Sequence, residues 1–132
     1  MSSEHAIGPH AASFDEALVH LRFTNNIEEE HAAEVIEFCS VSSQKAPFAI
    51  ICTTPDMKNV TPKARKVFAD GFKELPVVAA AFVDASIRTR AIVTFVVTAI
   101  NVFRSKKMLF AFFDAEGEAR DWARVQLSSW TD

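Results

Sequence analysis

The chain has 132 residues, of which 49% are hydrophobic and 23% charged, and its formal net charge is -3. A chain of this length and apolar content forms one core and one domain, and its nearly balanced charge excludes a large electrostatic footprint for nucleic acid. The longest apolar run, Ala91 to Phe103, is shorter than the roughly 20 residues of a membrane span, so no transmembrane segment is expected.

The N-terminal stretch MSSEHAIGPH lacks the basic start and apolar run of a secretory signal. We therefore expect a cytoplasmic protein with a loose segment over 1–10 and a single domain over 11–132. Cys39 and Cys52 have no CxxC spacing and no nearby histidine, which predicts buried free thiols.

Residues from Ala11 to Phe23 predict a hairpin with a turn at Asp15-Glu16 and a strand over 18–23. A helix to about Ser40 should follow, because Asn25 or Asn26 can cap it and acidic residues fill its first turn. Alternation in the strand predicts that Val19, Leu21 and Phe23 point inward. Helical spacing predicts the same for the helix residues Ala32, Val35, Ile36 and Cys39.

The run Phe48 to Cys52 is apolar without alternation, which is typical of a strand covered on both faces. Thr61 is the predicted cap of the next helix, with Pro62 at its first position. Pro76 ends this helix, and the apolar run 77–83 predicts a second buried strand.

The next segment is rich in β-branched residues, yet its polar residues recur at helical spacing from Arg90 to Ser105. This pattern predicts a helix from Ala91 to Phe103 with a wide apolar face. Residues 108–113 predict the last strand, and Asp114 is the predicted cap of the last helix. This helix should pack on the domain through Ala119, Trp122 and Ala123.

The order of these elements predicts an α/β fold, with a mostly parallel sheet of four to five strands, a leading hairpin as the antiparallel edge, and about four helices. Together with the segments NVTPKARKVFADGFKELP and FFDAEGEARDWA, this order resembles the STAS-like superfamily over residues 11–127. That superfamily includes bacterial anti-sigma-factor antagonists and the tails of sulfate transporters. The chain looks most similar to its small stand-alone bacterial members, whose role is not established.

The resemblance implies a non-enzymatic protein-interaction or regulatory module. In the antagonists, a serine at the start of the corresponding helix is phosphorylated by a partner kinase, and Thr61 is the matching residue here. Thr53 and Pro55 stand where the antagonists have Asp and Ser, and 59–63 replaces their acidic, glycine-containing element. Thr61 is thus a candidate phosphorylation site, although a plain helix cap also explains it.

The segment from Cys52 to Lys66 is predicted to be a loop that ends at this helix start. Its candidate binding residues for an anion or an acidic partner are Lys58, Thr61, Lys63 and Arg65. Positive side chains beside free backbone N–H groups favour a bound anion. The alternative is a solvated basic face.

The helix over 91–103 carries more apolar residues than one sheet face needs. The candidate contact residues are Ile92, Phe95, Val96, Ala99, Ile100 and Phe103. Three alternatives could cover them: a protein partner or a second copy in a homodimer, an apolar ligand such as a lipid tail, or neighbouring helices with Trp122 or Trp130. Lipid-carrying CRAL-TRIO domains resemble the STAS architecture, which favours the lipid slightly.

No catalytic constellation is recognisable. Hydroxyls at Ser42, Ser43, Thr53 and Thr54 have no histidine predicted nearby to act as a base. The histidines at positions 5, 10, 20 and 31 lack the close pairing of metal ligands. We therefore expect no enzymatic activity, no metal and no cofactor.

Overall fold

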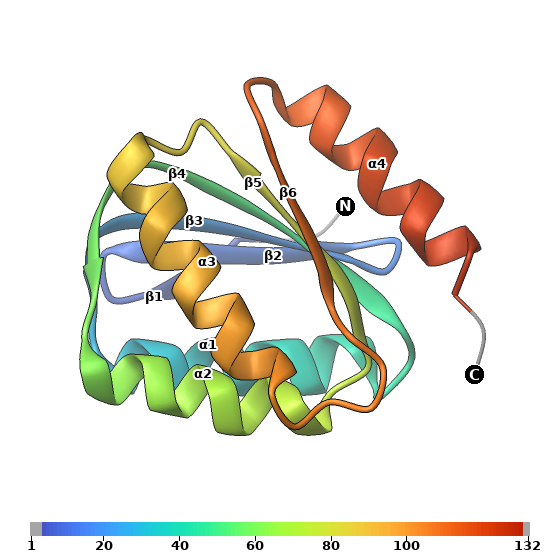
Figure 1. Ribbon diagram of the computed structural model, residues 1–132, viewed down its shortest axis with the longest axis horizontal. Coiled ribbons are helices and arrows are strands. Elements are labelled where there is room, and N and C mark those ends of the chain that lie inside the picture. The colour runs from blue at the N-terminus through green and yellow to red at the C-terminus, as the bar shows by residue number, and fades with distance from the viewer. Residues whose placement is uncertain (1–3, 131–132) are drawn as a thin grey trace.

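The computed structural model describes residues 4–130, which form a six-stranded sheet and four helices (Figure 1). The strands follow one another across the sheet in chain order, from β1 to β6. Their bounds are β1 His5–Ile7, β2 His10–Asp15, β3 Leu18–Ile27, β4 Phe48–Val60, β5 Val77–Val83 and β6 Leu109–Phe113. The helices are α1 Glu29–Ser43, α2 Pro62–Glu74, α3 Ile87–Asn101 and α4 Glu116–Ser128.

The sheet is mixed. β1, β2 and β3 pair antiparallel, whereas β3, β4, β5 and β6 pair parallel. This arrangement confirms the α/β prediction, but the sheet has more strands than predicted and is less dominated by parallel pairs. The extra strand is β1, which lies in the segment predicted to be loose, and Ile7 within it is fully buried. Residues 1–3 lie outside the described part of the chain.

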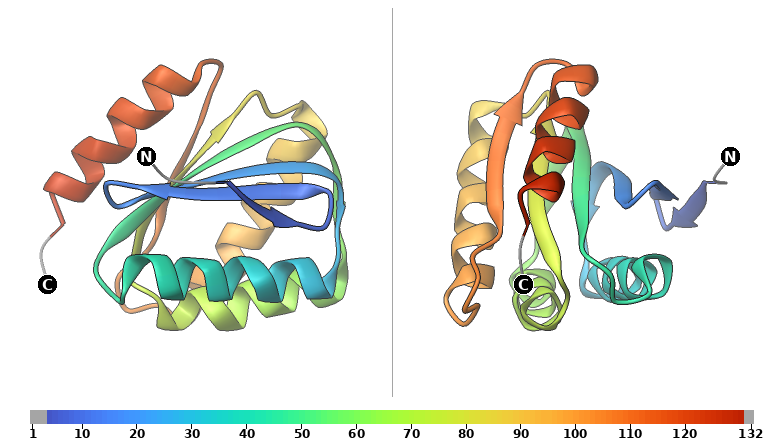
Figure 2. Two further views of the ribbon diagram at one scale, coloured as in Figure 1. Left: turned by 180° about the vertical axis from the view of Figure 1, so that it is seen from behind. Right: turned by 90° about the vertical axis from the view of Figure 1, so that its right-hand side faces the viewer.

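The two faces of the sheet are covered unequally. Helices α1, α2 and α3 bury the larger core against one face, and α4 alone packs on the other face, over β4 and β5 (Figure 2). Val19, Leu21 and Phe23 point into the larger core, as their alternation predicted. The α4 face over β2 and β3 therefore stays open.

The first helix begins later than predicted. β3 continues to Ile27, so Glu28 is the N-cap of α1 and makes a capping box with His31, in place of the predicted cap at Asn25 or Asn26. Asn25 instead has a positive φ of 62° inside β3, where the pairing with β4 shifts register. The helix also runs to Ser43, beyond the predicted end at Ser40.

The segment predicted as a loop after Cys52 is a strand. β4 continues to Val60, paired with the second half of β3 up to the partners Ile27 and Val60. Its pairing with β5 ends at Thr53, so the rest of β4 has a neighbour on one side only. In this half-paired part only Thr54, Met57 and Val60 are buried, unlike the fully buried stretch before it.

The last two helices also differ from their predicted bounds. α3 begins at Ile87 and is capped by the hydroxyl of Ser86, which accepts a hydrogen bond from the Thr89 amide. The N-cap of α4 is Ala115, with no side-chain cap, so the predicted capping by Asp114 is wrong. α4 docks through Ala119 and Ala123 as expected. Within residues 4–130, no helix is long and apolar enough to cross a membrane.

Candidate functional site

The α2 start lies where β4 ends. The Oγ1 atom of Thr61 accepts a hydrogen bond from the amide of Ala64 at 3.2 Å, and Pro62 takes the first helical position, which confirms the predicted cap. The first turn of α2 carries no acidic residue. The positive end of the helix dipole is therefore not neutralised by its own helix.

Three basic side chains surround this helix start. Lys58 and Lys63 are exposed, whereas Arg65 is held in place. Its Nε atom donates to the carbonyl of Val60 at 2.8 Å, and one terminal nitrogen donates to Oδ1 of Asn59 at 3.2 Å. Arg65 therefore ties α2 to the end of β4, and the two lysines supply the mobile charges.

The apolar face predicted on the third helix is divided. Ile100 is buried, while Ile92, Val96 and Ala99 are half-buried. Phe95 and Phe103 point outward, with 58% and 78% of their side-chain area exposed. Trp122 and Trp130 pack in the cluster under α4, on the opposite face of the sheet, and so do not cover these two rings.

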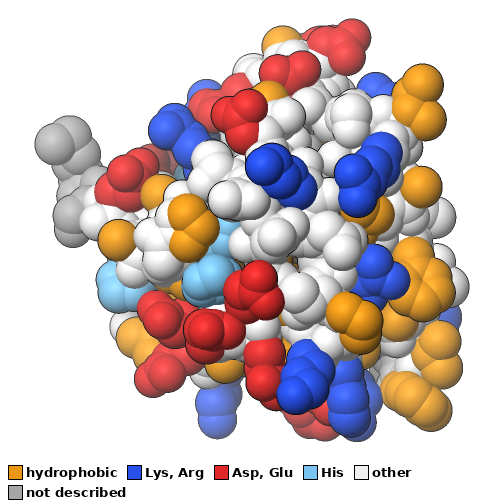
Figure 3. All heavy atoms as spheres, turned by 90° about the vertical axis from the view of Figure 1, so that its left-hand side faces the viewer, with side chains coloured by type: hydrophobic (Ala, Val, Ile, Leu, Met, Phe, Trp, Pro, Cys, Tyr) orange, Lys and Arg blue, Asp and Glu red, His pale blue; other side chains and the backbone are white. Residues whose placement is uncertain are grey.

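The basic α2 start and the exposed apolar face of α3 form one continuous surface. The guanidinium carbon of Arg65 lies 5.2 Å from the centroid of the Phe95 ring, a cation–π contact that joins α2 to α3. Figure 3 views the molecule from the side where both helices begin, and shows Lys and Arg side chains beside a group of hydrophobic ones. The surface thus combines positive charge, a helix start and exposed apolar area.

Behind α3 lies a cavity of about 70 Å³. Its lining is apolar except for Thr54, whose hydroxyl donates to the carbonyl of Val83 at 3.4 Å. The helical residues that line it include Phe68, Phe72, Val93, Val96, Val97 and Ile100. An apolar cavity of this kind suits a small apolar group.

A polar hollow of about 300 Å³ lies on the open face beside α4. Ser13, His20, Arg22, Thr53 and Glu116 line it, so His20 and Thr53 share a hollow that the sequence did not predict. The pairing across β2, β3 and β4 brings these distant residues together, and the outward alternation of His20 and Arg22 was its only sequence signal. Burial lowers the pKa of His20, although the Glu116 carboxylate opposes this shift.

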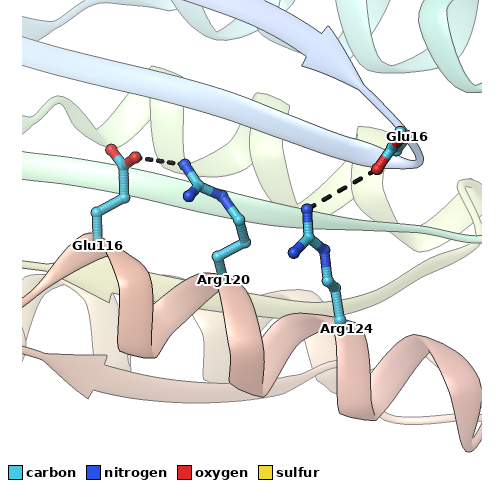
Figure 4. Close-up of polar contacts among 4 residues, drawn as sticks. All are labelled: Glu16, Glu116, Arg120 and Arg124. Atoms are coloured by element: carbon cyan, nitrogen blue, oxygen red, sulfur yellow. Dashed lines mark hydrogen bonds and ion pairs between the residues drawn. The ribbon is translucent and has the colours of Figure 1, made fainter.

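Two arginines on α4, Arg120 and Arg124, lie near His20 of this hollow and pair with acidic residues (Figure 4). Arg120 pairs with Glu116 one turn earlier, at 2.5 Å, and Arg124 reaches Glu16 in the β2–β3 turn at 3.8 Å. Both pairs are partly exposed, so each contributes little to stability. Only the Arg124–Glu16 pair joins α4 to the β2–β3 turn, since Arg120 and Glu116 both belong to α4.

Both thiols of the chain lie in the core. Cys39 and Cys52 are buried free thiols, as predicted. Burial raises the pKa of Cys39 to about 12 and raises that of Cys52 as well, so both stay protonated at neutral pH. Among residues 4–130, no group of His, Cys, Asp and Glu is arranged to hold a metal ion.

One pair of histidines was not predicted from the sequence. The rings of His10 and His31 lie 4.8 Å apart between β2 and α1, and His10 is only 3% exposed. Nδ1 of His10 accepts from the amide of Thr24, and its Nε2 lies 3.1 Å from the carbonyl of Asn26. The neutral ring is therefore fully hydrogen-bonded.

Known structures share this architecture. One is an uncharacterized protein of the DUF3478 family from Shewanella loihica PV-4, described as having a SpoIIAA-like fold; it matches with a TM-score of 0.57 and 14% identity, covering 86% of this chain and 93% of that one. Another is the anti-sigma factor antagonist SpoIIAA in its unphosphorylated form, with a TM-score of 0.50 and 16% identity, covering 94% and 98%. No family model and no curated protein matches the sequence.

These similarities define the fold of the chain. The chain has a STAS-like fold, as the resemblance of its sequence predicted. At this level of identity the comparison supports the fold alone. Activity and partners have to be argued from the surface described above.

Proposed function

We propose that the protein is a non-enzymatic interaction module of the STAS type, which binds a protein partner through the surface formed by the α2 start and the outer face of α3. The observation that carries this proposal is the contact between Arg65 and Phe95. It joins two features that protein partners use, a positively charged helix start and exposed aromatic rings. Lys58 and Lys63 select an acidic segment in this partner, and Phe95 supplies the apolar anchor.

The absence of enzymatic activity is part of the proposal. Both thiols are buried, and the hydroxyl of Thr54 is buried and bonded to the Val83 carbonyl. Ser13 lies opposite His20 in the pairing of β2 with β3, yet both belong to an open hollow on the other face of the sheet. At the α2 start, the described hydrogen bonds of the Thr61 hydroxyl include no histidine or carboxylate.

Regulation through Thr61 is a further element of this proposal. A phosphate on its Oγ1 atom would place negative charge at the α2 start, where the helix dipole and the two lysines favour it. The same charge would repel an acidic partner from the surface. Phosphorylation at Thr61 would therefore switch the partner off.

The experiment is site-specific photo-crosslinking in cells of the source organism. A photoreactive amino acid replaces Lys63 in one variant and Phe95 in another, because both side chains are exposed. The proposal predicts one adduct of the same mass from both positions. Val41, exposed on α1, is the control position and should give no such adduct. Unrelated adducts from positions 63 and 95 would contradict a single partner surface.

A second candidate function is binding of a lipid or another apolar ligand along α3. The cavity behind this helix favours it, because the cavity is nearly free of polar groups and reaches the half-buried Val96. Native mass spectrometry should then show a co-purified apolar molecule. Ala80→Leu, which fills the cavity from β5, should abolish it, whereas Phe95→Ser on the outer face should not.

A further inference from the structure

The outer edge of the sheet at β6 has an unusual composition for an unpaired strand. Its sequence, LFAFF, contains no charge, proline or glycine. None of its residues is buried, in contrast to β5, where all seven are. Edge strands are usually protected by charges, bulges or a covering segment, because their free backbone groups invite another strand.

Two residues direct their backbone groups outward along this edge. The amide of Asp84 donates to the carbonyl of Phe113. In a parallel ladder, the odd-numbered residues of β6 therefore turn their backbone N–H and C=O groups toward β5. Phe110 and Phe112 therefore turn their N–H and C=O groups away from the sheet. In the described part of the chain, no hydrogen bond uses these groups.

The edge is already capped at one end. The side-chain amide of Asn101 donates to the carbonyl of Met108 at 3.0 Å, and its Oδ1 accepts from the Met108 amide at 2.8 Å. Asn101 thus imitates a neighbouring strand for one residue only. The next two outward positions, Phe110 and Phe112, stay open between α3 and α4, which cover opposite faces of the sheet (Figure 2).

We propose that two copies of this chain pair antiparallel through β6, about a two-fold axis at Ala111, and join their sheets into one. In this register Phe110 lies opposite Phe112 of the second copy, and each such pair exchanges both backbone hydrogen bonds. Ala111 lies opposite Ala111 of the second copy at a non-hydrogen-bonded position, where the two strands are close and a small side chain fits. The proposal rests on the β6 edge, so it can fail without affecting the proposed partner surface.

Charge supports the antiparallel register and a second copy as the occupant. Lys106 and Lys107 precede β6, whereas the exposed Asp114 follows it. Antiparallel pairing about Ala111 brings the basic end of one strand to the acidic end of the other. Parallel pairing would place like charges together, which opposes binding.

The test introduces charges at the axis. Wild-type protein should sediment as a dimer at tens of micromolar, and Ala111→Glu or Ala111→Lys alone should raise the dimer's Kd by about tenfold or more, because like charges then face each other. An equimolar mixture of the two variants should recover dimer. Val41→Glu and Val41→Lys, at an exposed position on α1, should leave the wild-type dimer unchanged. A monomeric wild type, or variants that dimerise as the wild type does, would overturn the proposal.

A second measurement does not depend on the variants folding. Hydrogen exchange at the Phe110 and Phe112 amides of the wild-type protein should slow as protein concentration rises. No substitution is needed, because the comparison is between two concentrations of one protein. Exchange that is fast at every concentration would overturn the homotypic pairing. Protection that appears only when another protein is added would overturn it too, and would assign the edge to a strand of that partner.

Discussion

The guanidinium of Arg65 stacks on the ring of Phe95 and, at the same time, donates to the Val60 carbonyl. More than half of Phe95 is exposed, although the fixed charge of Arg65 lies over its ring. An aromatic ring held in this way loses little conformational entropy on binding, which suits it to anchor a partner. The predictions below test this surface and the contacts that shape it.

Reversing the two mobile charges should abolish binding without affecting the fold. In the variant Lys58→Glu with Lys63→Glu, we expect inorganic phosphate to lose its effect on the amide signals of the α2 start in an NMR titration. Wild-type binding should weaken as salt rises, because both lysines are exposed.

A matched control is Lys45→Glu with Lys73→Glu, which changes the net charge equally at the other end of the molecule. An unchanged phosphate response in the Lys58 and Lys63 variant would leave only a solvated basic face at the α2 start.

Loss of the α2 cap should have a separate and modest effect. Thr61→Ala removes the acceptor for the Ala64 amide and should lower the free energy of unfolding by about 1 kcal/mol. Urea denaturation measures this change. Thr61→Ser keeps the acceptor oxygen and should retain most of the stability; an equal loss in both variants would argue against the cap.

The Arg104 guanidinium donates several buried hydrogen bonds to backbone carbonyls. It is buried, its NH1 atom donates to the carbonyls of Phe72 and Leu75, and its NH2 atom donates to that of Val77. Arg104→Met leaves these buried carbonyls unsatisfied and should cost about 2 kcal/mol or more of unfolding free energy. Arg88→Met, at an exposed position on α3, should change it by less than about 0.5 kcal/mol. Similar losses in both would refute the structural role of Arg104.

Stability should fall as the pH is lowered, because His10 is buried in its neutral form. Burial, and then the nearby His31, lower its pKa below the ordinary value of 6.5. The unfolded chain therefore takes up a proton more readily than the folded one. Stability is complete above about pH 6.5 and is lost as the pH falls toward the folded pKa.

Urea midpoints measured across this range provide the check. His10→Gln should flatten the dependence, and the slope that remains belongs to His20, whose pKa burial also lowers. A wild-type midpoint that does not change with pH would contradict this account of His10.

Sequence periodicity was sufficient for most of the fold, because α2 and β5 owe their form to local signals such as Thr61, Pro62 and a continuous apolar run. It failed between Cys52 and Val60, where Pro55 and several polar residues suggested a loop. A strand tolerates a proline where one side lacks a neighbour, and β4 has lost β5 by that point. The missing information was the pairing of this segment with the second half of β3, which a local pattern cannot supply.

The candidate site could be predicted only in parts. Lys58, Thr61, Lys63 and Phe95 were recognisable from their types and neighbours, but their union depends on how α2 packs on α3. The same limit applies to His10 and His31, which meet only through the packing of β2 on α1. Arg104 lies in a basic surface-like run, RSKK, and nothing local distinguishes it from its neighbours.

The most direct test of the central claim is the affinity of the cross-linked partner for two separate variants, measured by calorimetry. Lys63→Glu alters the charged half of the surface and Phe95→Ser the apolar half. If both halves form one interface, each variant should weaken binding by at least about tenfold, as expected for anchor residues. Wild-type affinity in either variant would contradict a single surface joined by Arg65 and Phe95.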